Sequence, residues 1–279
     1  MNDFLSAALL GVLEGFTEFL PVSSTGHLVI ANQFVYFANP QFTKMFDIVI
    51  QLGAILAVAL VFWKRLLPWG KHVEAAGGSS KVWGLWLNSI IAFVPTGIAA
   101  LLLKDVVEAT LMTPVVVAST LIFYGVVFLF IERFAPKPKV TDVAELGWKL
   151  ALAIGFIQIL SLVPGTSRSG ITIIGALLLG VGRVAATEFT FFLALPTMGV
   201  ATLYSLYKYL KDAPLGFTGT ELGSLMVGFV VAFFVAWAVI VGFVKFVQNN
   251  NFVAFGVYRI VLGAAVLALL SMGMLGAAA

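Results

Sequence analysis

The sequence predicts an all-α polytopic membrane protein with six transmembrane helices and two re-entrant helical hairpins, arranged as an inverted-topology repeat. The chain has 279 residues, of which 61% are hydrophobic and only 10% charged, and its mean hydropathy is +1.07. A soluble domain usually carries about 25% charged residues. Many apolar stretches reach the roughly 20 residues that a helix needs to cross a bilayer. In addition, two polar stretches that resemble each other interrupt the apolar pattern, one in each half of the chain.

The apolar segments define the predicted elements in order. They cover 4–21, 27–38, 45–63, 83–103, 113–131, 147–163, 170–182, 186–207, 222–247 and 252–275. Segments 27–38 and 170–182 are too short to span, so each forms a re-entrant hairpin with the segment before it. The other six are full spans, three after each hairpin. An odd number of spans places the second unit upside down relative to the first, which is an inverted repeat.

We expect one integral membrane domain over 1–279, built from repeat 1 (1–133) and repeat 2 (147–279), which a cytoplasmic linker (134–146) joins. The prolines and charges at the start of this linker are typical of a loop. Ten basic residues then fall on one face: Lys64, Arg65, Lys71, Lys81, Arg133, Lys137, Lys139, Lys149, Arg183 and Lys245. The opposite face has four: Lys44, Lys104, Lys208 and Lys211. The positive-inside rule places the richer face in the cytoplasm.

Composition also excludes several classes of function. The chain contains no cysteine, which excludes disulfides, thiolate catalysis and cysteine-ligated metal sites. The net charge of +3 comes from basic residues scattered in short loops, so we expect bilayer lipid and no nucleic acid as partner. The N-terminus has no basic residue before its apolar run, so a cleaved signal peptide is not expected.

The two polar stretches, which we call the first break (15–27) and the second break (158–170), share proline, hydroxyl residues and glycine in register. The second has one extra residue. The first contains Pro21, Ser23, Ser24, Thr25 and Gly26, and the second contains Pro164, Thr166, Ser167, Ser169 and Gly170. Polar groups at membrane depth are costly unless they face protein or a wet cavity. The breaks therefore indicate a functional site.

Two carboxylates precede the first break on one helical face. Glu14 and Glu18 are four residues apart, and a like-charged pair at this spacing is destabilising. Two functions justify it, namely ligation of a hard divalent cation or proton sharing for acid/base work. An interfacial pair near water is the structural alternative.

Hydroxyl residues of the first break precede a new apolar helix. Ser23, Ser24 and Thr25 suit a helix start, where they act as N-caps. A helix N-terminus is also a phosphate site because its N–H groups are free. We expect His27 in the first turn of this helix, within reach of the Ser24 side chain, as an acid/base or nucleophile. His72 lies in a basic loop and receives no role.

Arg168 is the charged residue of the second break, between Thr166, Ser167 and Ser169. A guanidinium at membrane depth requires an anion, and its planar fork suits carboxylate or phosphate. The structural alternative is that Arg168 only neutralises Glu14 or Glu18, which also brings the breaks together. Carboxylates, hydroxyls at two helix starts, a histidine and an arginine together predict a phosphoryl-transfer site.

Other polar residues in the apolar segments are interpreted as structural. Asp47 and Gln51, four residues apart, are candidates for a layer behind the site, and Arg259 for an interhelix ion pair. Glu188 is expected to pair with Arg183 or with another helix. The aromatic residues Phe189, Phe191 and Phe192 are expected to face lipid or the core.

The residues of both breaks carry a resemblance. Residues 14–27 (EGFTEFLPVSSTGH) resemble the first signature of the undecaprenyl-pyrophosphate phosphatase family, also called the BacA or bacitracin-resistance family. Residues 164–170 (PGTSRSG) resemble its second signature, and Glu188-Phe189 with 193–196 (LALP) are similar to a further family stretch. The similarity extends over nearly the whole chain.

The resemblance implies a multi-pass enzyme of the bacterial inner membrane with its active site facing the outer side. Such enzymes hydrolyse undecaprenyl diphosphate to undecaprenyl phosphate and inorganic phosphate, which recycles the lipid carrier for cell-wall synthesis and confers bacitracin resistance. It also implies a divalent cation, with Mg, Ca and Mn left open. By position, the family's functional residues are Glu14, Glu18, Ser24, Thr25, His27, Ser167 and Arg168.

Residues and resemblance together give the expected site. We assign catalysis to Glu18, Ser24, His27 and Arg168. We assign phosphate binding to Ser23, Thr25, Thr166, Ser167, Ser169 and Arg168, and metal binding to Glu14 and Glu18. The nucleophile stays open between Ser24, His27 and water, and the oligomeric state between monomer and homodimer. The rival function is a secondary transporter or polyprenyl-lipid flippase, with Asp47 and Glu188 as coupling residues. A membrane protein with a purely structural role is the third alternative.

Overall fold

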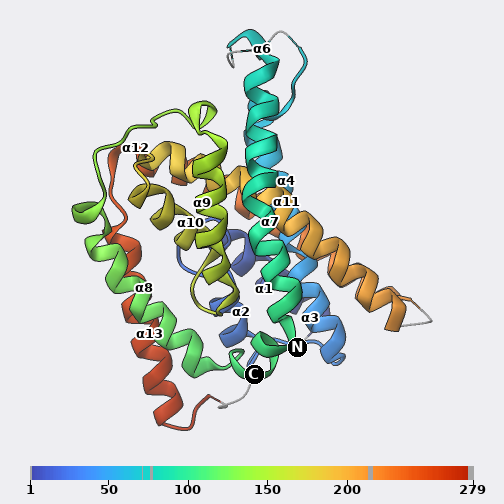
Figure 1. Cartoon of the computed structure of the whole chain (residues 1–279). Helices are drawn as coiled ribbons and strands as arrows, with labels where there is room; N and C mark the ends of the chain where they lie inside the picture. Colours follow the sequence, from blue (N-terminus) through green and yellow to red (C-terminus); the bar gives the residue numbers. More distant parts are fainter. Residues whose placement is uncertain (1, 71, 76–77, 213–215, 276–279) are drawn as a thin grey trace.

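The computed structural model describes residues 2–70, 72–75, 78–212 and 216–275 (Figure 1). Its α-helices are α1 (Asp3–Thr17), α2 (Ser24–Ala31), α3 (Pro40–Val49), α4 (Gln51–Val61), α5 (Trp63–Leu66), α6 (His72–Ala75), α7 (Ser79–Thr110), α8 (Pro114–Phe134), α9 (Trp148–Gln158), α10 (Arg168–Leu178), α11 (Arg183–Asp212), α12 (Gly219–Asn249) and α13 (Val253–Ser271). Two 3₁₀ helices, η1 (Val143–Glu145) and η2 (Ile159–Leu162), complete the order. The described residues form no β-strand, so the predicted all-α class is confirmed.

Six helical stretches are long and apolar enough to cross a membrane, as the sequence predicts. They are Pro40–Val61, Ser79–Leu103, Pro114–Phe134, Arg183–Asp212, Gly219–Asn249 and Val253–Ser271. Capping residues explain where several helices begin. For example, Thr113 caps α8 and Pro114 occupies its first turn, where proline loses no hydrogen bond.

The segments predicted to form the two hairpins contain shorter helices, with α1 and α2 around the first break and α9 and α10 around the second. The helix expected over 27–38 ends earlier, at Ala31. Asn32 is its C-cap, and the Asn32 side chain donates a hydrogen bond of 2.5 Å to Asp47 Oδ2 on α3. Asn and Asp form such side-chain bonds readily at helix ends, in competition with continued helix.

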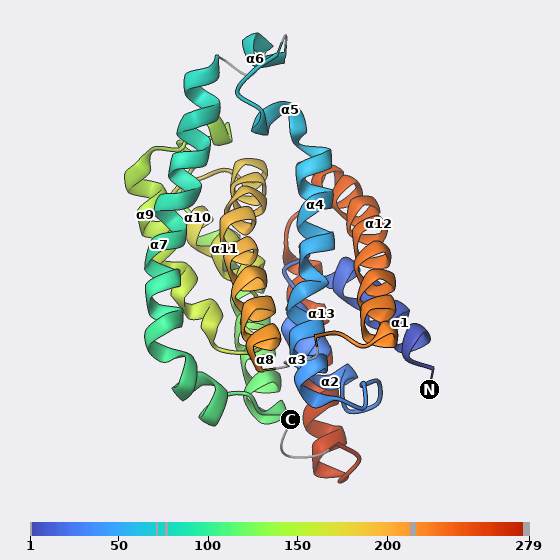
Figure 2. The same ribbon diagram turned by 90° about the vertical axis from the view of Figure 1, so that its right-hand side faces the viewer.

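Helix α11 lies between two groups of helices. It contacts α4 and α3 on one side and α7 and α10 on the other, and Figure 2 shows α4 and α12 to its right and α7 and α9 to its left. The α8–α13 pair packs as a further unit. The two breaks, one after α1 and one after α9, therefore lie near the middle of the helix bundle.

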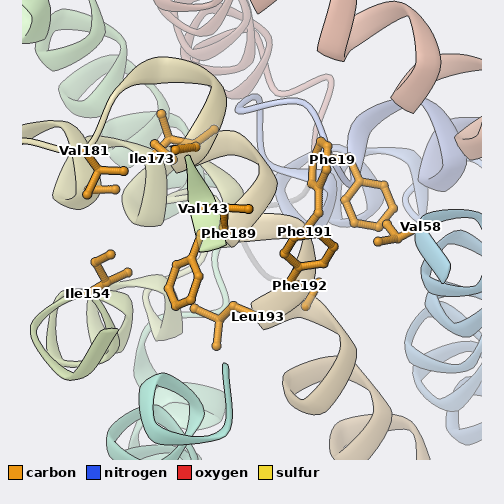
Figure 3. Close-up of a cluster of buried hydrophobic side chains, with 14 of the residues drawn as sticks. Phe19, Val58, Val143, Ile154, Ile173, Val181, Phe189, Phe191, Phe192 and Leu193 are labelled. Atoms are coloured by element: carbon orange, nitrogen blue, oxygen red, sulfur yellow. The ribbon is translucent and has the colours of Figure 1, made fainter. Parts of the chain in front are cut away.

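The core around α11 fixes the end of the first break. Phe189, Phe191 and Phe192 are at most 1% exposed, which settles their expected placement in favour of the core. Phe19, next to Glu18, is fully buried and its ring packs edge-on against Phe191 at 5.2 Å. Figure 3 shows these rings together with Val58 of α4. Because an aromatic side chain buries a large apolar area, Phe19 anchors the backbone that carries Glu18.

The helix α5, the linker and the start of α11 lie at one end of the molecule. Ion pairs of the described residues connect the helices at this end. Glu188 pairs with Arg65 at 2.5 Å, so the expected Arg183 pairing is wrong and the alternative of a different helix is correct. Arg183 instead pairs with Glu132 of α8, also at 2.5 Å. The linker is ordered beside α11, since Gly182 N–H donates to the Val140 carbonyl at 2.8 Å.

Candidate active site

The two breaks end in the same local geometry. Ser23 caps α2 with φ 73° and Ser167 caps α10 with φ 75°, and among the described residues no other non-glycine has a positive φ. Each serine Oγ accepts a hydrogen bond from a glycine N–H three residues on, from Gly26 at 3.2 Å and from Gly170 at 3.0 Å. Strained backbone of this kind persists only where its surroundings hold it, and it often marks functional sites.

An ion pair joins the two breaks. Arg168 Nη2 donates to Glu18 Oε1 at 2.7 Å, with the two side chains only 12% and 7% exposed. Arg168 Nη1 also reaches the Thr190 carbonyl of α11 at 3.4 Å. The predicted anionic partner of Arg168 is therefore a carboxylate of the other break, and the two breaks touch as expected. Arginine carries five N–H groups, and the contacts with Glu18 and Thr190 are the two that the described residues make with this guanidinium.

Glu18 also contacts the candidate nucleophile. The Ser24 hydroxyl donates a hydrogen bond to Glu18 Oε2, so one carboxylate contacts both Ser24 and Arg168. The backbone of Glu18 is held as well, since Ser169 Oγ donates to the Glu18 carbonyl at 3.3 Å and to the Leu20 carbonyl at 3.0 Å. A hydroxyl hydrogen-bonded to an oriented base is the arrangement of an activated nucleophile.

His27 lies in the first turn of α2 as predicted, but its ring nitrogens have other partners than Ser24. Nδ1 lies 2.7 Å from the Ser23 carbonyl, and Nε2 lies 2.7 Å from the hydroxyl of Tyr258 on α13. The rings of His27 and Tyr258 are nearly parallel, 5.7 Å apart. Within the described residues, the base that contacts Ser24 is therefore Glu18, and the expected His27–Ser24 contact is absent.

Glu14 is fully buried one helical turn before Glu18. Neither carboxylate oxygen of Glu14 accepts a hydrogen bond from a described residue, and its charged neighbours are Glu18, Asp47 and Arg168. Open carboxylate oxygens fit a hard cation, and Mg²⁺ in particular binds through one or two carboxylates plus substrate phosphates. No set of three or more His, Cys, Asp or Glu residues in the described chain could hold a metal by itself. Glu14 and Glu18 thus offer oxygen donors of the type that a hard cation binds, but only Glu18 lines the neighbouring cavity.

The site opens into a cavity of about 970 Å³. Its polar end is lined by Glu18, Ser23, Ser24, Thr25, Ser167 and Arg168. Its apolar walls include Val94, Ile98 and Leu101 of α7 and Val200 and Ala201 of α11. Thr166 and Ser169, each 1% exposed, are not among the lining residues. Of the residues expected to bind phosphate, Ser23, Thr25, Ser167 and Arg168 thus face the cavity, and Thr166 and Ser169 lie behind it.

Arg259 is the main residue of the site that sequence reasoning missed. It is fully buried, and the expected interhelix ion pair is wrong, because its hydrogen bonds go to backbone carbonyls. Nη1 donates to Pro21 O at 3.0 Å, and Nη2 donates to Gly165 O at 2.7 Å and Thr166 O at 3.0 Å. A buried arginine in a span is a visible signal in the sequence, but carbonyl partners leave no pattern there.

Comparisons with known proteins place the chain in a family. The family model of bacitracin resistance protein BacA matches residues 7–265. Undecaprenyl-diphosphatase 1 of Oenococcus oeni is 44% identical over 279 residues, which covers 97% of this chain and 98% of the relative. The undecaprenyl-diphosphatase of Lacticaseibacillus casei is 45% identical over 270 residues (96% and 98%), and that of Enterococcus faecalis is 46% identical over 269 residues (95% and 96%). The chain belongs to the bacitracin resistance protein BacA family.

Proposed function

We propose that this protein hydrolyses undecaprenyl diphosphate to undecaprenyl phosphate and inorganic phosphate. This reaction recycles the lipid carrier for cell-wall synthesis, and it confers bacitracin resistance because it removes the diphosphate that the antibiotic sequesters. One observation carries the proposal. The Glu18 carboxylate contacts both Ser24 and Arg168 at the polar end of a cavity with apolar walls, in a chain whose relatives are named undecaprenyl-diphosphatase.

The cavity suits an amphiphile with an anionic head. Arg168 and the starts of α2 and α10 lie at its polar end, where a diphosphate group would bind. The N–H groups in the first turn of a helix lack intrahelical acceptors and attract phosphate. The walls from α7 and α11 offer apolar surface for the prenyl chain. We propose that the lipid enters sideways between helices, so that its tail stays in an apolar environment.

The contacts support Ser24 as nucleophile. Ser24 Oγ attacks the terminal phosphorus while Glu18 Oε2 takes its proton, and the bond from phosphorus to the bridging oxygen breaks. Undecaprenyl phosphate leaves with that oxygen, and the phosphoryl group stays on Ser24. The proton on Glu18 passes to solvent as undecaprenyl phosphate leaves, so that Glu18 is a base again. Water then attacks the phosphoserine, Glu18 accepts a proton from the water and returns it to Ser24 Oγ as the bond from phosphorus to that oxygen breaks, and inorganic phosphate is released. The Arg168 guanidinium stabilises the charge that develops on the phosphoryl oxygens.

A divalent cation fits Glu14 and Glu18. Glu14 offers two oxygens to which no described residue donates a hydrogen bond, and Glu18 is its neighbour on the same face. When bound, the cation supplies positive charge that offsets the diphosphate and polarises it. Magnesium, calcium and manganese all accept such oxygen ligands.

We further propose that repeat 1 (1–133) and repeat 2 (147–279) are inverted copies, each beginning with a re-entrant hairpin. The N-cap serines Ser23 and Ser167 give the register. In this register Gly11 matches Gly155, and both mark a close helix crossing. A Cβ on Gly11 would lie 2.6 Å from the Gly228 carbonyl of α12, and one on Gly155 would lie 2.3 Å from the Ala92 carbonyl of α7. Each hairpin thus packs on the matching helix of the other repeat, as a two-fold relation requires.

The distribution of basic residues supports an active site on the outer side of the bacterial inner membrane. Lys44 and Lys208 line the cavity, and both belong to the face with few basic residues. Arg65 and the linker lie at the opposite end, beside the start of α11. The positive-inside rule places that end in the cytoplasm. Because the chain has no native cysteine, single Lys208→Cys and Lys137→Cys variants test the orientation. An impermeant maleimide should label the first in intact cells and the second only after permeabilisation.

The test of the function is phosphate release from undecaprenyl diphosphate by purified protein in detergent, where no gradient can exist. Turnover under these conditions supports the phosphatase and counts against the transporter or flippase, which needs two compartments. Trapping with labelled substrate in denaturant at neutral pH, where both phosphoserine and phosphohistidine survive, should place the phosphoryl group on Ser24. Absence of turnover with added magnesium, calcium and manganese would overturn the proposed function, and label on His27 would overturn the assignment of Ser24.

A further inference from the structure

We propose that Arg259 is a positioning residue that fixes the two phosphate-binding turns relative to each other and aims one backbone N–H at the phosphate. This inference rests on the proposed function, because it concerns the same site. Arg259 belongs to α13, outside both breaks, and it does not line the cavity. Its effect on the reaction would therefore pass through the backbone of the two turns.

The guanidinium connects both breaks at once. It donates to Pro21 O in the turn before α2 and to Gly165 O and Thr166 O in the turn before α10. Few side chains could do this, because arginine presents several donors in one rigid plane. A lysine has three donors on a single nitrogen and does not reproduce this fork. The spacing of the two turns thus depends on the shape of the side chain and not only on its charge.

The carbonyl contacts also decide where one amide points. In a trans peptide the C=O and the N–H point in opposite directions. The Thr166 carbonyl faces Arg259, so the N–H of Ser167 points away from Arg259, and Ser167 is a residue that lines the cavity. No described group accepts a hydrogen bond from this N–H. The geometry assigns it to a phosphoryl oxygen, as a backbone donor beside Arg168.

The surroundings of Arg259 explain how the cation is tolerated without a carboxylate. The described residues provide no salt bridge for it, and its Nε has no acceptor. The guanidinium carbon lies 5.9 Å from the ring centroids of both Tyr124 and Phe128, a distance at which aromatic faces attract cations. The positive charge of Arg259 therefore acts mainly on the backbone carbonyls of the two turns, and it polarises the peptide groups there that face the cavity.

Arg259→Lys is the informative variant because it keeps the positive charge. We expect kcat to fall about 10²-fold, the loss expected when one preorganised donor is misplaced, with the KM for lipid within about threefold because the apolar walls are intact. We expect inorganic phosphate to inhibit about tenfold more weakly. Arg183→Lys is the matched control, since Arg183 is ion-paired to Glu132 and neither residue lines the cavity. It should keep wild-type kcat and phosphate inhibition.

A second readout is independent of turnover. Inorganic phosphate should raise the midpoint of thermal unfolding of wild type and of Arg183→Lys, and it should raise that of Arg259→Lys much less. Wild-type kcat and phosphate response in a folded Arg259→Lys protein would overturn the inference, as would a loss of thermal stability alone. If wild type stabilises with phosphate but releases none from undecaprenyl diphosphate, the proposed function fails while the positioning role of Arg259 stands.

Discussion

Substitutions in the ion pair between Arg168 and Glu18 can separate the effect of this pair on protein stability from its effect on catalysis. The perturbation is a pair of neutral substitutions, Arg168→Gln and Glu18→Gln, made singly and together. The pair is short, at 2.7 Å, and its side chains are 12% and 7% exposed. Removal of one partner of a buried pair typically costs about 3–5 kcal/mol because it leaves an uncompensated charge. We expect about 3 kcal/mol for each single variant, since both residues border a cavity that water can enter.

The double variant should recover stability but not activity. In the double variant neither member of the pair is left as an uncompensated charge, and we expect the free energy of unfolding within about 1 kcal/mol of wild type. Turnover should stay low in all three variants. Glu18→Gln removes the acceptor of the Ser24 proton, which costs about 10²–10⁴-fold. Arg168→Gln removes a charge-stabilising donor, which costs about 10²–10³-fold.

The assay combines urea unfolding in detergent micelles with phosphate release at saturating lipid. The ion pair of Arg183 with Glu132 serves as control, because it is more exposed, at 41% and 24%, and lies outside the cavity. Its neutral variants should lose about 1 kcal/mol or less and keep wild-type turnover. A double variant no more stable than the singles would refute the buried-pair reasoning. An Arg168→Gln protein with wild-type turnover would refute its place in the site.

Three further predictions concern single residues. Ser24→Ala should lower turnover at least about 10³-fold while leaving phosphate binding detectable by thermal shift, because the anion-binding groups remain; near-native turnover would exclude the serine as nucleophile. Gly165→Ala should unfold at lower temperature and lose activity, because Gly165 has φ 86° and a Cβ there would lie 2.0 Å from a threonine hydroxyl of α8. Gly242→Ala, with nothing within 4 Å, is its control and should match or slightly exceed wild-type stability. Glu14→Gln should raise the divalent-cation concentration for half-maximal turnover about tenfold or more, measured by metal titration after chelator treatment; an unchanged titration would place the cation elsewhere.

Much of the architecture follows from local properties of the chain. The six spans are readable because a membrane helix is recognised by length and hydropathy alone. The contact between Arg168 and Glu18 could also be anticipated, because an anion stabilises a guanidinium at membrane depth and the first break offers two carboxylates. The helix starts at Ser24 and Arg168 follow from capping residues in the same pattern.

Other contacts could not be predicted, for physical reasons specific to each. Glu188 was expected to pair with Arg183 or with an unspecified residue of another helix, and only packing selected Arg65. His27 pairs with the hydroxyl of Tyr258, a residue far away in sequence. The partners of Arg259 are backbone carbonyls, which every residue carries, so no sequence pattern marks them.

The sequence by itself determined a membrane-spanning helical chain with two polar interruptions and the charges they contain, because hydropathy, helix capping and the cost of buried charge act locally. The tertiary structure alone decided which groups meet. It placed Glu18 between Ser24 and Arg168, gave both ring nitrogens of His27 other partners, and set Arg259 behind the two turns. The physical reason is that hydrogen bonds act over about 3 Å, so their pairing depends on how the helices pack.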